Sequence, residues 1–309
     1  MASRRGLAID GVLLLDKPIG LSSNHVLQRA RRILNARKAG HTGTLDPFAT
    51  GLMVLCFGEA TKFSGGMFEA DKAYAATVQF GQETDSGDLT GTPVGDAVPG
   101  PYDWLADEAS VTRLLAGFVG VQQQVPPMIS ALKRDGKPLY AYAREGIELE
   151  REPREITIHG IELVSRDVAA GQMVISVACS KGTYIRTLAQ DIGRAVGAGA
   201  HLTTLRRTRT AGFDLAQALT LEQLEAMAEP TAALLAPDSL LADLPVCGLE
   251  PALATRFSLG QTVAAPPGGP SAGRTRVYGP GDTFLGTARR VGGWVKPDRL
   301  MALNKESST

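Results

Sequence analysis

The sequence feature that most constrains the fold is an uninterrupted apolar run, GLMVLCF, at residues 51–57. A strand with one face in water alternates apolar and polar residues, whereas a strand buried on both faces has a near-continuous apolar sequence. Glycines stand at both ends of the run. No segment of the sequence approaches the roughly 18 apolar residues of a membrane span. The run therefore predicts a strand that other parts of the chain cover on both sides.

Asp46 lies just before this run, in the segment GHTGTLDPFAT. Leu45 and Phe48 give it apolar neighbours, and Pro47 biases its backbone away from helical dihedral angles. A charge in such surroundings costs free energy unless a nearby group stabilises it. Two interpretations follow: Asp46 belongs to an ordinary Asp-Pro turn, or it is a functional carboxylate whose partner comes from elsewhere in the chain.

The segments on either side predict a helix, a strand and a loop. Residues 22–36 have helical apolar spacing and a serine at their start that can cap the helix. Residues 72–81 have a two-residue period that places Tyr74 on the apolar face of a strand. The acidic, turn-rich residues 82–91 fit no calcium-loop pattern, so we expect a solvated loop there.

Residues 173–197 read as a strand, a tight turn and a helix, with Arg186 in the first turn of the helix. A cation there opposes the helix dipole. The position of Arg186 makes sense if the side chain faces an anion, either Asp46 or a phosphate. An arginine at the end of an apolar stripe is otherwise a surface residue.

Length and composition indicate a two-domain globular protein of 309 residues. Beyond Pro245 the sequence changes to brief strand patterns around a Pro/Gly-rich loop, which fits a small β-rich domain. The three cysteines and four histidines are scattered without metal-ligand spacing. Nucleotide-binding motifs are also missing from the sequence. We therefore expect no cofactor, no metal, a mature N-terminus and a cytoplasmic location.

Charge is segregated along the chain although the net charge is zero. Residues 1–64 carry five more basic than acidic residues, residues 130–210 carry four more, and residues 65–129 carry seven fewer. The local field, rather than the net charge, steers a polyanion. The basic run with Arg206, Arg207 and Arg209 fits contacts to an RNA backbone, or an ordinary solvated face.

Six segments together carry a resemblance to a known family. They are GVLLLDKPIGLSS, GHTGTLDPFATGLMVLCFGEATK, KAYAATVQFGQETDSGD, QVPPMISALKRDGKPLYAYAREG, SKGTYIRTLAQDIG and AHLTTLRRTRTAGF. In sequence and order they resemble the bacterial tRNA pseudouridine synthase B family, densely over residues 10–215 and more loosely beyond. The GHTGTLDPxATG and KGTYIRTL segments together are highly specific for that family.

The resemblance implies both a fold and a reaction. Residues 1–245 would form a mixed α+β catalytic domain with a twisted, largely antiparallel central sheet and flanking helices. Residues 246–309 would form a small β-rich, PUA-like RNA-binding domain. The reaction would be isomerisation of uridine 55, in the T arm of tRNA, to pseudouridine. We expect a monomer that binds tRNA and no membrane.

The resemblance also implies the site residues. Asp46 would be the catalytic carboxylate and Arg186 the cation that pairs with it. Tyr74 would pack on the target base and is a candidate for the proton step. The residues implied in substrate binding are His41, which would take the place of the displaced base, Tyr74, Tyr184, which would contact the nucleoside, and Leu205, which would line the pocket.

Two alternatives to a stand-alone synthase stay open. One is a non-catalytic RNA-binding or RNA-folding factor on the same scaffold, which would need none of Asp46, Tyr74 and Arg186. The other is a guide-RNA-dependent member of the superfamily, whose chains usually carry long lysine-rich tails. The polar end of this chain, NKESST, is not of that kind.

Overall fold

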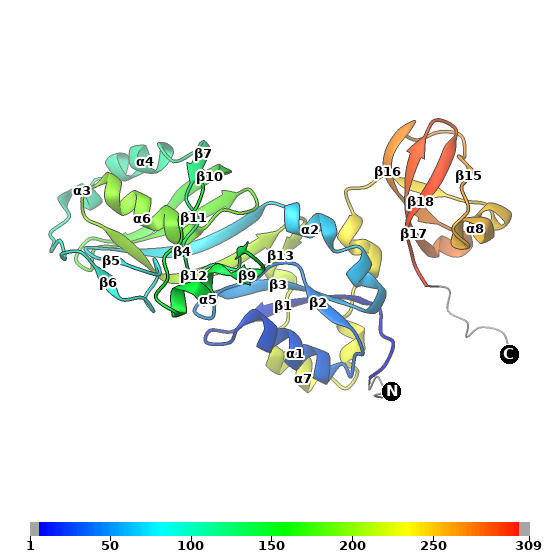
Figure 1. Cartoon of the computed structure of the whole chain (residues 1–309), viewed down its shortest axis with the longest axis horizontal. Coiled ribbons are helices and arrows are strands. Elements are labelled where there is room, and N and C mark those ends of the chain that lie inside the picture. Colours follow the sequence, from blue (N-terminus) through cyan, green and yellow to red (C-terminus); the bar gives the residue numbers. More distant parts are fainter. Residues whose placement is uncertain (1–5, 303–309) are drawn as a thin grey trace.

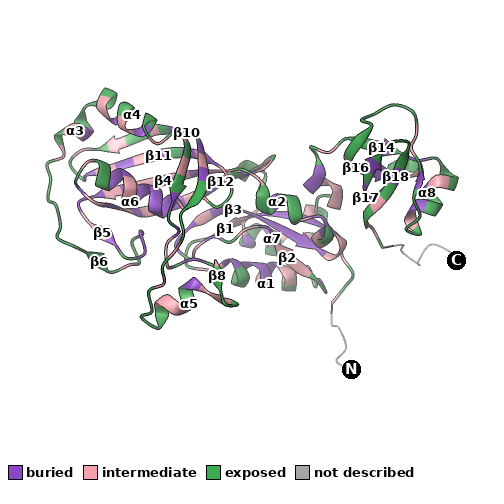
Figure 2. Ribbon diagram, turned by 45° about the horizontal axis from the view of Figure 1, so that its top comes forward, coloured by how far each residue is buried: buried purple, intermediate pink, exposed green. Residues whose placement is uncertain are grey.

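The apolar run forms β3 (Thr50–Phe57), in which every residue from Gly51 onward is buried. In this computed structural model, which describes residues 6–302, alternate residues of β3 enter two different apolar cores. Met53 and Leu55 belong to the larger core, and Val54 and Cys56 to a smaller one on the other face. The prediction of a strand covered on both sides is confirmed, and Figure 2 shows β3 buried along its length.

The central sheet has the order β1-β3-β12-β4-β11-β10-β7. Only β3 and β12 run parallel along this path, and every other neighbouring pair is antiparallel. The expected mixed, largely antiparallel sheet is therefore confirmed. Its other strands are β1 (Gly11–Lys17), β4 (Lys72–Phe80), β7 (Gly120–Gln124), β10 (Arg154–Asp167), β11 (Gln172–Cys179) and β12 (Ala200–Thr210), with β2 (Ala39–His41) and β13 (Phe213–Asp214) at its margins.

Helices cover one face of the whole sheet and only part of the other (Figure 1). The larger core contains apolar residues of α1 (Ser23–Ile33), α4 (Glu108–Ala116), α6 (Ile185–Ala195) and α7 (Leu221–Ala226). The smaller core packs α2 (Gly65–Glu69) and the 3-10 turn at Pro237–Leu241 against β1 and β3. The smaller core contains no residue of β4, and along β4 buried residues alternate with half-buried ones. The second face of the sheet is therefore only partly covered at β4. The remaining short elements are α3 (Asp103–Ala106), β5 (Glu83–Thr84), β6 (Pro93–Val94), β8 (Lys133–Arg134), β9 (Lys137–Pro138) and α5 (Leu139–Arg144).

The C-terminal part forms a second sheet with its own core, at one end of the molecule (Figure 1). Its strand order is β14-β16-β17-β18-β15, and Phe257 of α8 packs into its centre. Phe284 lies against Phe63 of the first part, with ring centroids 5.2 Å apart. The expected small β-rich domain is confirmed. Its elements are β14 (Val246–Gly248), α8 (Pro251–Ser258), β15 (Val263–Ala264), β16 (Ala272–Tyr278), β17 (Phe284–Val291) and β18 (Trp294–Leu300).

Several local predictions need correction. The acidic segment 82–91 is not a solvated loop, because Thr84, Ser86 and Asp88 are buried. The basic run at 200–210 is a central strand, β12, in which buried residues alternate with less buried ones. The strand was not predicted because the two-residue pattern is recognised by apolar residues at the buried positions, and here arginines occupy part of the segment. The predicted polar tail lies outside the described residues.

Within residues 6–302, no helix is long and apolar enough to cross a membrane.

Candidate active site

The segment that carries Asp46 connects β2 to β3, and buried side chains hold its main chain. Ser23, at the start of α1, donates from Oγ to the carbonyl of Leu45 (2.9 Å) and accepts from the Leu45 N–H (2.8 Å). Lys17, at the end of β1, donates from Nζ to the carbonyls of Pro47 (3.2 Å) and Ala49 (2.5 Å). Both sides of the Asp-Pro turn are therefore fixed.

Lys17 is fully buried, although lysine is rarely so. Burial lowers its pKa to about 8, and the negative charge of Asp46 opposes that shift. The charges of Lys17 and Asp46 therefore stabilise each other.

Arg186, in the first turn of α6, pairs with Asp46, with 3.0 Å between Nε of the arginine and Oδ2 of the aspartate. The Arg186 side chain is 3% exposed, whereas the Asp46 side chain is 35% exposed. The remaining guanidinium nitrogens donate to the carbonyls of Ser86 and Ile129, each at 2.6 Å. Because each of these bonds comes from a different segment, the guanidinium has one orientation, and it presents one edge to Asp46.

Asp88 is a second acid beside the same guanidinium, with Oδ2 at 3.7 Å from Nη1 of Arg186. Its other oxygen accepts from the hydroxyl of Ser86 (3.0 Å) and the N–H of Thr90 (2.9 Å). Asp88 is almost fully buried, so its charge acts on Arg186 through a medium of low dielectric.

The pKa of Asp46 is raised, and burial is the largest cause. Arg186 and Lys17 oppose the shift, and the charge of Asp88 adds to it. The sequence argument weighed burial against one arginine only. In the structure burial outweighs that cation, and the second acid works in the same direction as burial.

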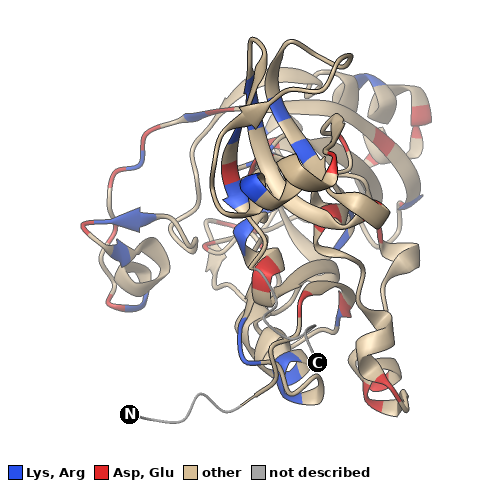
Figure 3. Cartoon of the chain, turned by 90° about the vertical axis from the view of Figure 1, so that its right-hand side faces the viewer, with Lys and Arg blue, Asp and Glu red and all other residues tan. Residues whose placement is uncertain are grey.

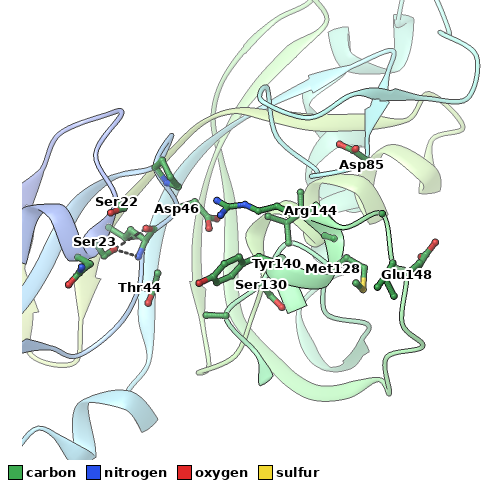
Figure 4. Close-up of a pocket in the computed structure, with 18 of the residues that line it drawn as sticks. Ser22, Ser23, Thr44, Asp46, Asp85, Met128, Ser130, Tyr140, Arg144 and Glu148 are labelled. Atoms are coloured by element: carbon green, nitrogen blue, oxygen red, sulfur yellow. Dashed lines mark hydrogen bonds between the residues drawn. The ribbon is translucent and has the colours of Figure 1, made fainter. Parts of the chain in front are cut away.

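A cavity of about 810 Å³ opens over Asp46 (Figure 4). Such a volume is typical of sites that enclose small molecules or single groups of larger ones. One wall holds the polar residues Ser22, Asn24, His41 and Thr44 beside Asp46. The opposite wall is a segment that we call the flap, residues 128–148, which includes α5. Its contribution is largely apolar, from Met128, Ile129, Tyr140, Ala143 and Ile147, with Arg144 and Glu148 at the same wall.

His41 lines the cavity, and its Nδ1 is buried without a hydrogen-bond partner among the residues described. Burial, and secondarily the charge of Arg207, lowers its pKa. The lowered pKa favours the neutral form of the His41 ring, which suits stacking on a base better than pairing with a phosphate.

Tyr74, Tyr184 and Leu205 lie outside the lining of this cavity. Tyr74 and Leu205 are buried in the larger core. Burial raises the pKa of both tyrosine hydroxyls, and the charge of Asp46 adds to each shift. The main chain of Tyr184 is fixed by Gln124, whose side chain bonds its N–H (2.8 Å) and its carbonyl (3.1 Å).

Sequence reasoning missed Lys17, Ser23 and Asp88 as parts of the site. Lys17 offered a signal, because only Asp16 separates it from the apolar run GVLLL and a proline follows it. Asp88 offered none, since an acidic segment rich in glycine and serine is typical of a loop in water. Among residues 6–302, no group of three or more histidine, cysteine or acidic side chains is placed to hold a metal ion.

Two solved structures share the fold of this chain. The chain is similar to one in a solved Cbf5–Nop10–Gar1 complex, with a TM-score of 0.70 and 24% identity over 94% of this chain and 85% of that one. It is equally similar to a chain in an H/ACA RNP bound to a substrate RNA containing 2′-deoxyuridine, with a TM-score of 0.70 and 21% identity over 96% and 86% of the two chains. At these identities the likeness concerns the fold alone.

The sequence comparisons define the family. Residues 31–185 match the model of the TruB family pseudouridylate synthase N-terminal domain, residues 186–243 that of the tRNA pseudouridylate synthase B C-terminal domain, and residues 245–301 that of the pseudouridine synthase II TruB C-terminal region. The tRNA pseudouridine synthase B of Bordetella pertussis is 64% identical over 244 residues, 79% of this chain and 98% of that protein. That of Burkholderia mallei is 54% identical over 301 residues, 95% and 97% of the two chains. The chain belongs to the TruB family of pseudouridylate synthases.

Proposed function

We propose that this protein isomerises a uridine of tRNA to pseudouridine, and that the target is position 55 in the T arm. Membership of the TruB family supports the reaction, as do relatives that carry the name tRNA pseudouridine synthase B. The observation that carries the proposal is the Asp46–Arg186 pair, in which the carboxylate opens onto the cavity while its partner is almost completely buried.

The reaction breaks the C1′–N1 bond of the nucleotide, turns the uracil and forms a C1′–C5 bond. No atoms are gained or lost and no electrons are transferred, so the chemistry requires no cofactor. The base cannot react while it is stacked, and flipping it out costs a few kcal/mol. His41, an imidazole ring on the cavity wall, would offset part of that loss by stacking in the vacated place.

Asp46 must be ionised to act, whether it attacks the sugar, attacks the ring or removes a proton. Arg186 and Lys17 favour the ionised form against the effect of burial. Tyr74 would pack on the flipped base and take part in the proton step, Tyr184 would contact the nucleoside, and Leu205 would close the pocket from the core side. These roles rest on the family resemblance, and the charge of Asp46 adds to the rise in the pKa of both tyrosines.

We assign catalysis to residues 1–245 and further RNA contacts to a PUA-like domain of residues 246–309. The separate apolar core of the C-terminal sheet supports this division. Its strands carry the exposed basic residues Arg289, Lys296 and Arg299, and Figure 3 shows basic residues along the strands on this side of the molecule. Such residues would bind phosphates with a salt-dependent affinity. We expect the protein to act as a monomer in the cytoplasm.

The test is incubation of the purified protein with an unmodified tRNA transcript, followed by mapping of pseudouridine at every uridine. The proposal predicts product at position 55, and no product with Asp46→Asn at equal tRNA binding. Binding without product at any uridine would instead support the non-catalytic RNA factor.

A further inference from the structure

Three arginines of one basic run in β12 occupy three different environments. Arg209 is exposed. Arg206 is paired with Asp16 at 2.6 Å, and its side chain is 41% exposed. Arg207 is 3% exposed and belongs to the protein interior. A contact with an RNA backbone is therefore excluded for Arg207 in this fold, and its charge needs another explanation.

Arg207 lies in a row of residues that crosses four strands. Lys17 of β1 is paired with Gly51 of β3, Gly51 is paired with Arg207, and Arg207 is paired with Tyr74 of β4. Gly51 has a φ of +103°, and a Cβ there would lie 2.3 Å from the carbonyl oxygen of Arg207. The close approach of β3 and β12 at this point therefore depends on glycine. Gly51, which has no side chain, therefore lies between Lys17 and Arg207 in this row.

The Arg207 side chain ties β12 to the segment that carries Asp46. Its Nε donates to the carbonyl of Leu52 (2.7 Å), and its Nη2 donates to the carbonyl of Gly43 (3.3 Å). Gly43 stands two residues after His41 and three before Asp46. Both bonds go to neutral carbonyl oxygens rather than to a carboxylate, so the buried charge keeps most of its desolvation cost. An apolar side chain of similar size would fill the same space without that cost.

We propose that Arg207 is a positioning residue for the isomerisation, which holds the His41–Asp46 segment in register with Tyr74. The inference rests on the proposed function. Arg207 fixes the N-terminal side of the segment at the Gly43 carbonyl, while Ser23 and Lys17 fix its C-terminal side at Leu45, Pro47 and Ala49. Its charge also acts on two of the implied substrate-binding groups, because it lowers the pKa of His41 and opposes the rise in the pKa of Tyr74.

The test compares Arg207→Met and Arg207→Lys with Arg290→Met. Arg290 is a matched control, since it is also buried and donates to two main-chain carbonyls, those of Gly268 (2.8 Å) and Pro266 (3.0 Å), but contacts no residue of the cavity. Single-turnover rates with the protein in saturating excess over tRNA, tRNA dissociation constants and melting temperatures are measured for each. Because a misplacement of about 1 Å costs on the order of 100-fold in rate, Arg207→Met should lose about that factor with tRNA affinity nearly unchanged. Arg207→Lys, which keeps one cationic donor, should lose less.

The control distinguishes a positioning role of Arg207 in the reaction from a role in the stability of the fold alone. Arg290→Met should keep a rate within about 2-fold of the wild type at a temperature where both proteins are folded. A folded Arg207→Met protein with a wild-type rate would overturn the inference. If Arg207→Met does not fold, Arg207→Lys decides, and a wild-type rate in that variant overturns it equally. Absence of product from the wild-type protein would instead overturn the proposed function, so the two failures are distinct.

Discussion

The segment at residues 43–49 and the Pro/Gly-rich loop at residues 265–271 are held in a similar way. In each, a buried arginine donates to main-chain carbonyls, Arg207 to Gly43 and Arg290 to Pro266 and Gly268. The two regions differ in what else converges on them. Asp46 faces the buried cations Lys17 and Arg186 and opens onto a cavity, whereas residues 267–271 are exposed to solvent.

The comparison teaches that an anchored loop alone does not define a site. Buried hydrogen bonds to carbonyls stabilise a backbone wherever they occur. The first region is distinguished by opposite charges, those of Asp46 and of Lys17 and Arg186. They are largely shielded from water, but Asp46 faces a cavity that can admit a ligand. Perturbed titration at such a place is a sign of function. The predictions below test whether these opposed charges, rather than the anchoring of the loop, distinguish the site.

The largest expected effect is that of Asp46→Asn. The amide keeps the shape of the side chain but has no negative charge, so neither nucleophilic attack nor proton removal is possible. We expect the single-turnover rate to fall on the order of 10⁴-fold, as for the loss of other essential catalytic groups. The measurement is the rate of pseudouridine formation with all tRNA bound. Retention of more than a tenth of the wild-type rate would show that the carboxylate is not the reacting group.

Arg186→Lys should have the next largest effect. A lysine has the charge but cannot donate to Asp46, Ser86 and Ile129 in the fixed directions of a guanidinium. Misplacement of the Asp46 carboxylate should lower the rate about 100-fold. Rapid-quench kinetics at saturating tRNA would measure it. An unchanged rate would mean that charge alone, without orientation, is sufficient.

Asp88→Asn should have a smaller effect with an informative sign. The charge of Asp88 raises the pKa of Asp46, so its removal should lower that pKa and extend activity toward acid pH. At neutral pH we expect a loss of about 10-fold, since the variant leaves Arg186 with a weaker partner for its second edge. Rates from pH 5 to 8 test both statements. Loss of the acid side of the profile would contradict the sign.

Arg290→Met should have the smallest effect on the reaction and a clear effect on stability. The carbonyls of Pro266 and Gly268 lose a charged donor, and we expect a loss of about 1–3 kcal/mol in the unfolding free energy of the C-terminal part. The midpoint of urea unfolding, monitored by Trp294, measures this loss. A fall in the turnover rate of the folded variant would show that the second region also serves catalysis.

The sequence predicted more of the sheet than of its surroundings. The apolar run and the two-residue period of Lys72–Phe80 predicted β3 and β4, because the buried positions of these strands are occupied by apolar residues. The strand β12 was not visible, since Arg207 takes an interior position that an apolar residue usually has. Its interior place depends on carbonyl partners from β3 and from the turn before it, and a pattern within one segment cannot show those.

The site was predicted in the same uneven way. The pairing of Asp46 with Arg186 was expected, and the two side chains lie 3.0 Å apart. The roles of Tyr74, Tyr184, His41 and Leu205 stay predictions. Asp88 and Lys17 were not predicted as site residues. Their effect on Asp46 and Arg186 arises because the fold buries them beside segments that are distant in the sequence. The place of the flap over the cavity depends on tertiary packing, which no pattern within that segment could show.

The most direct test of the central claim is a titration of the Asp46 carboxyl group by carbon-13 NMR, assigned by comparison with Asp46→Asn. We predict a midpoint above the ordinary aspartate value of about 3.9, because burial outweighs the two cations, with the group still ionised at pH 7. A midpoint at the ordinary value would show a carboxylate in free contact with water. A protonated carboxyl at pH 7 would show that Arg186 and Lys17 do not keep it charged, and either result would contradict this mechanism.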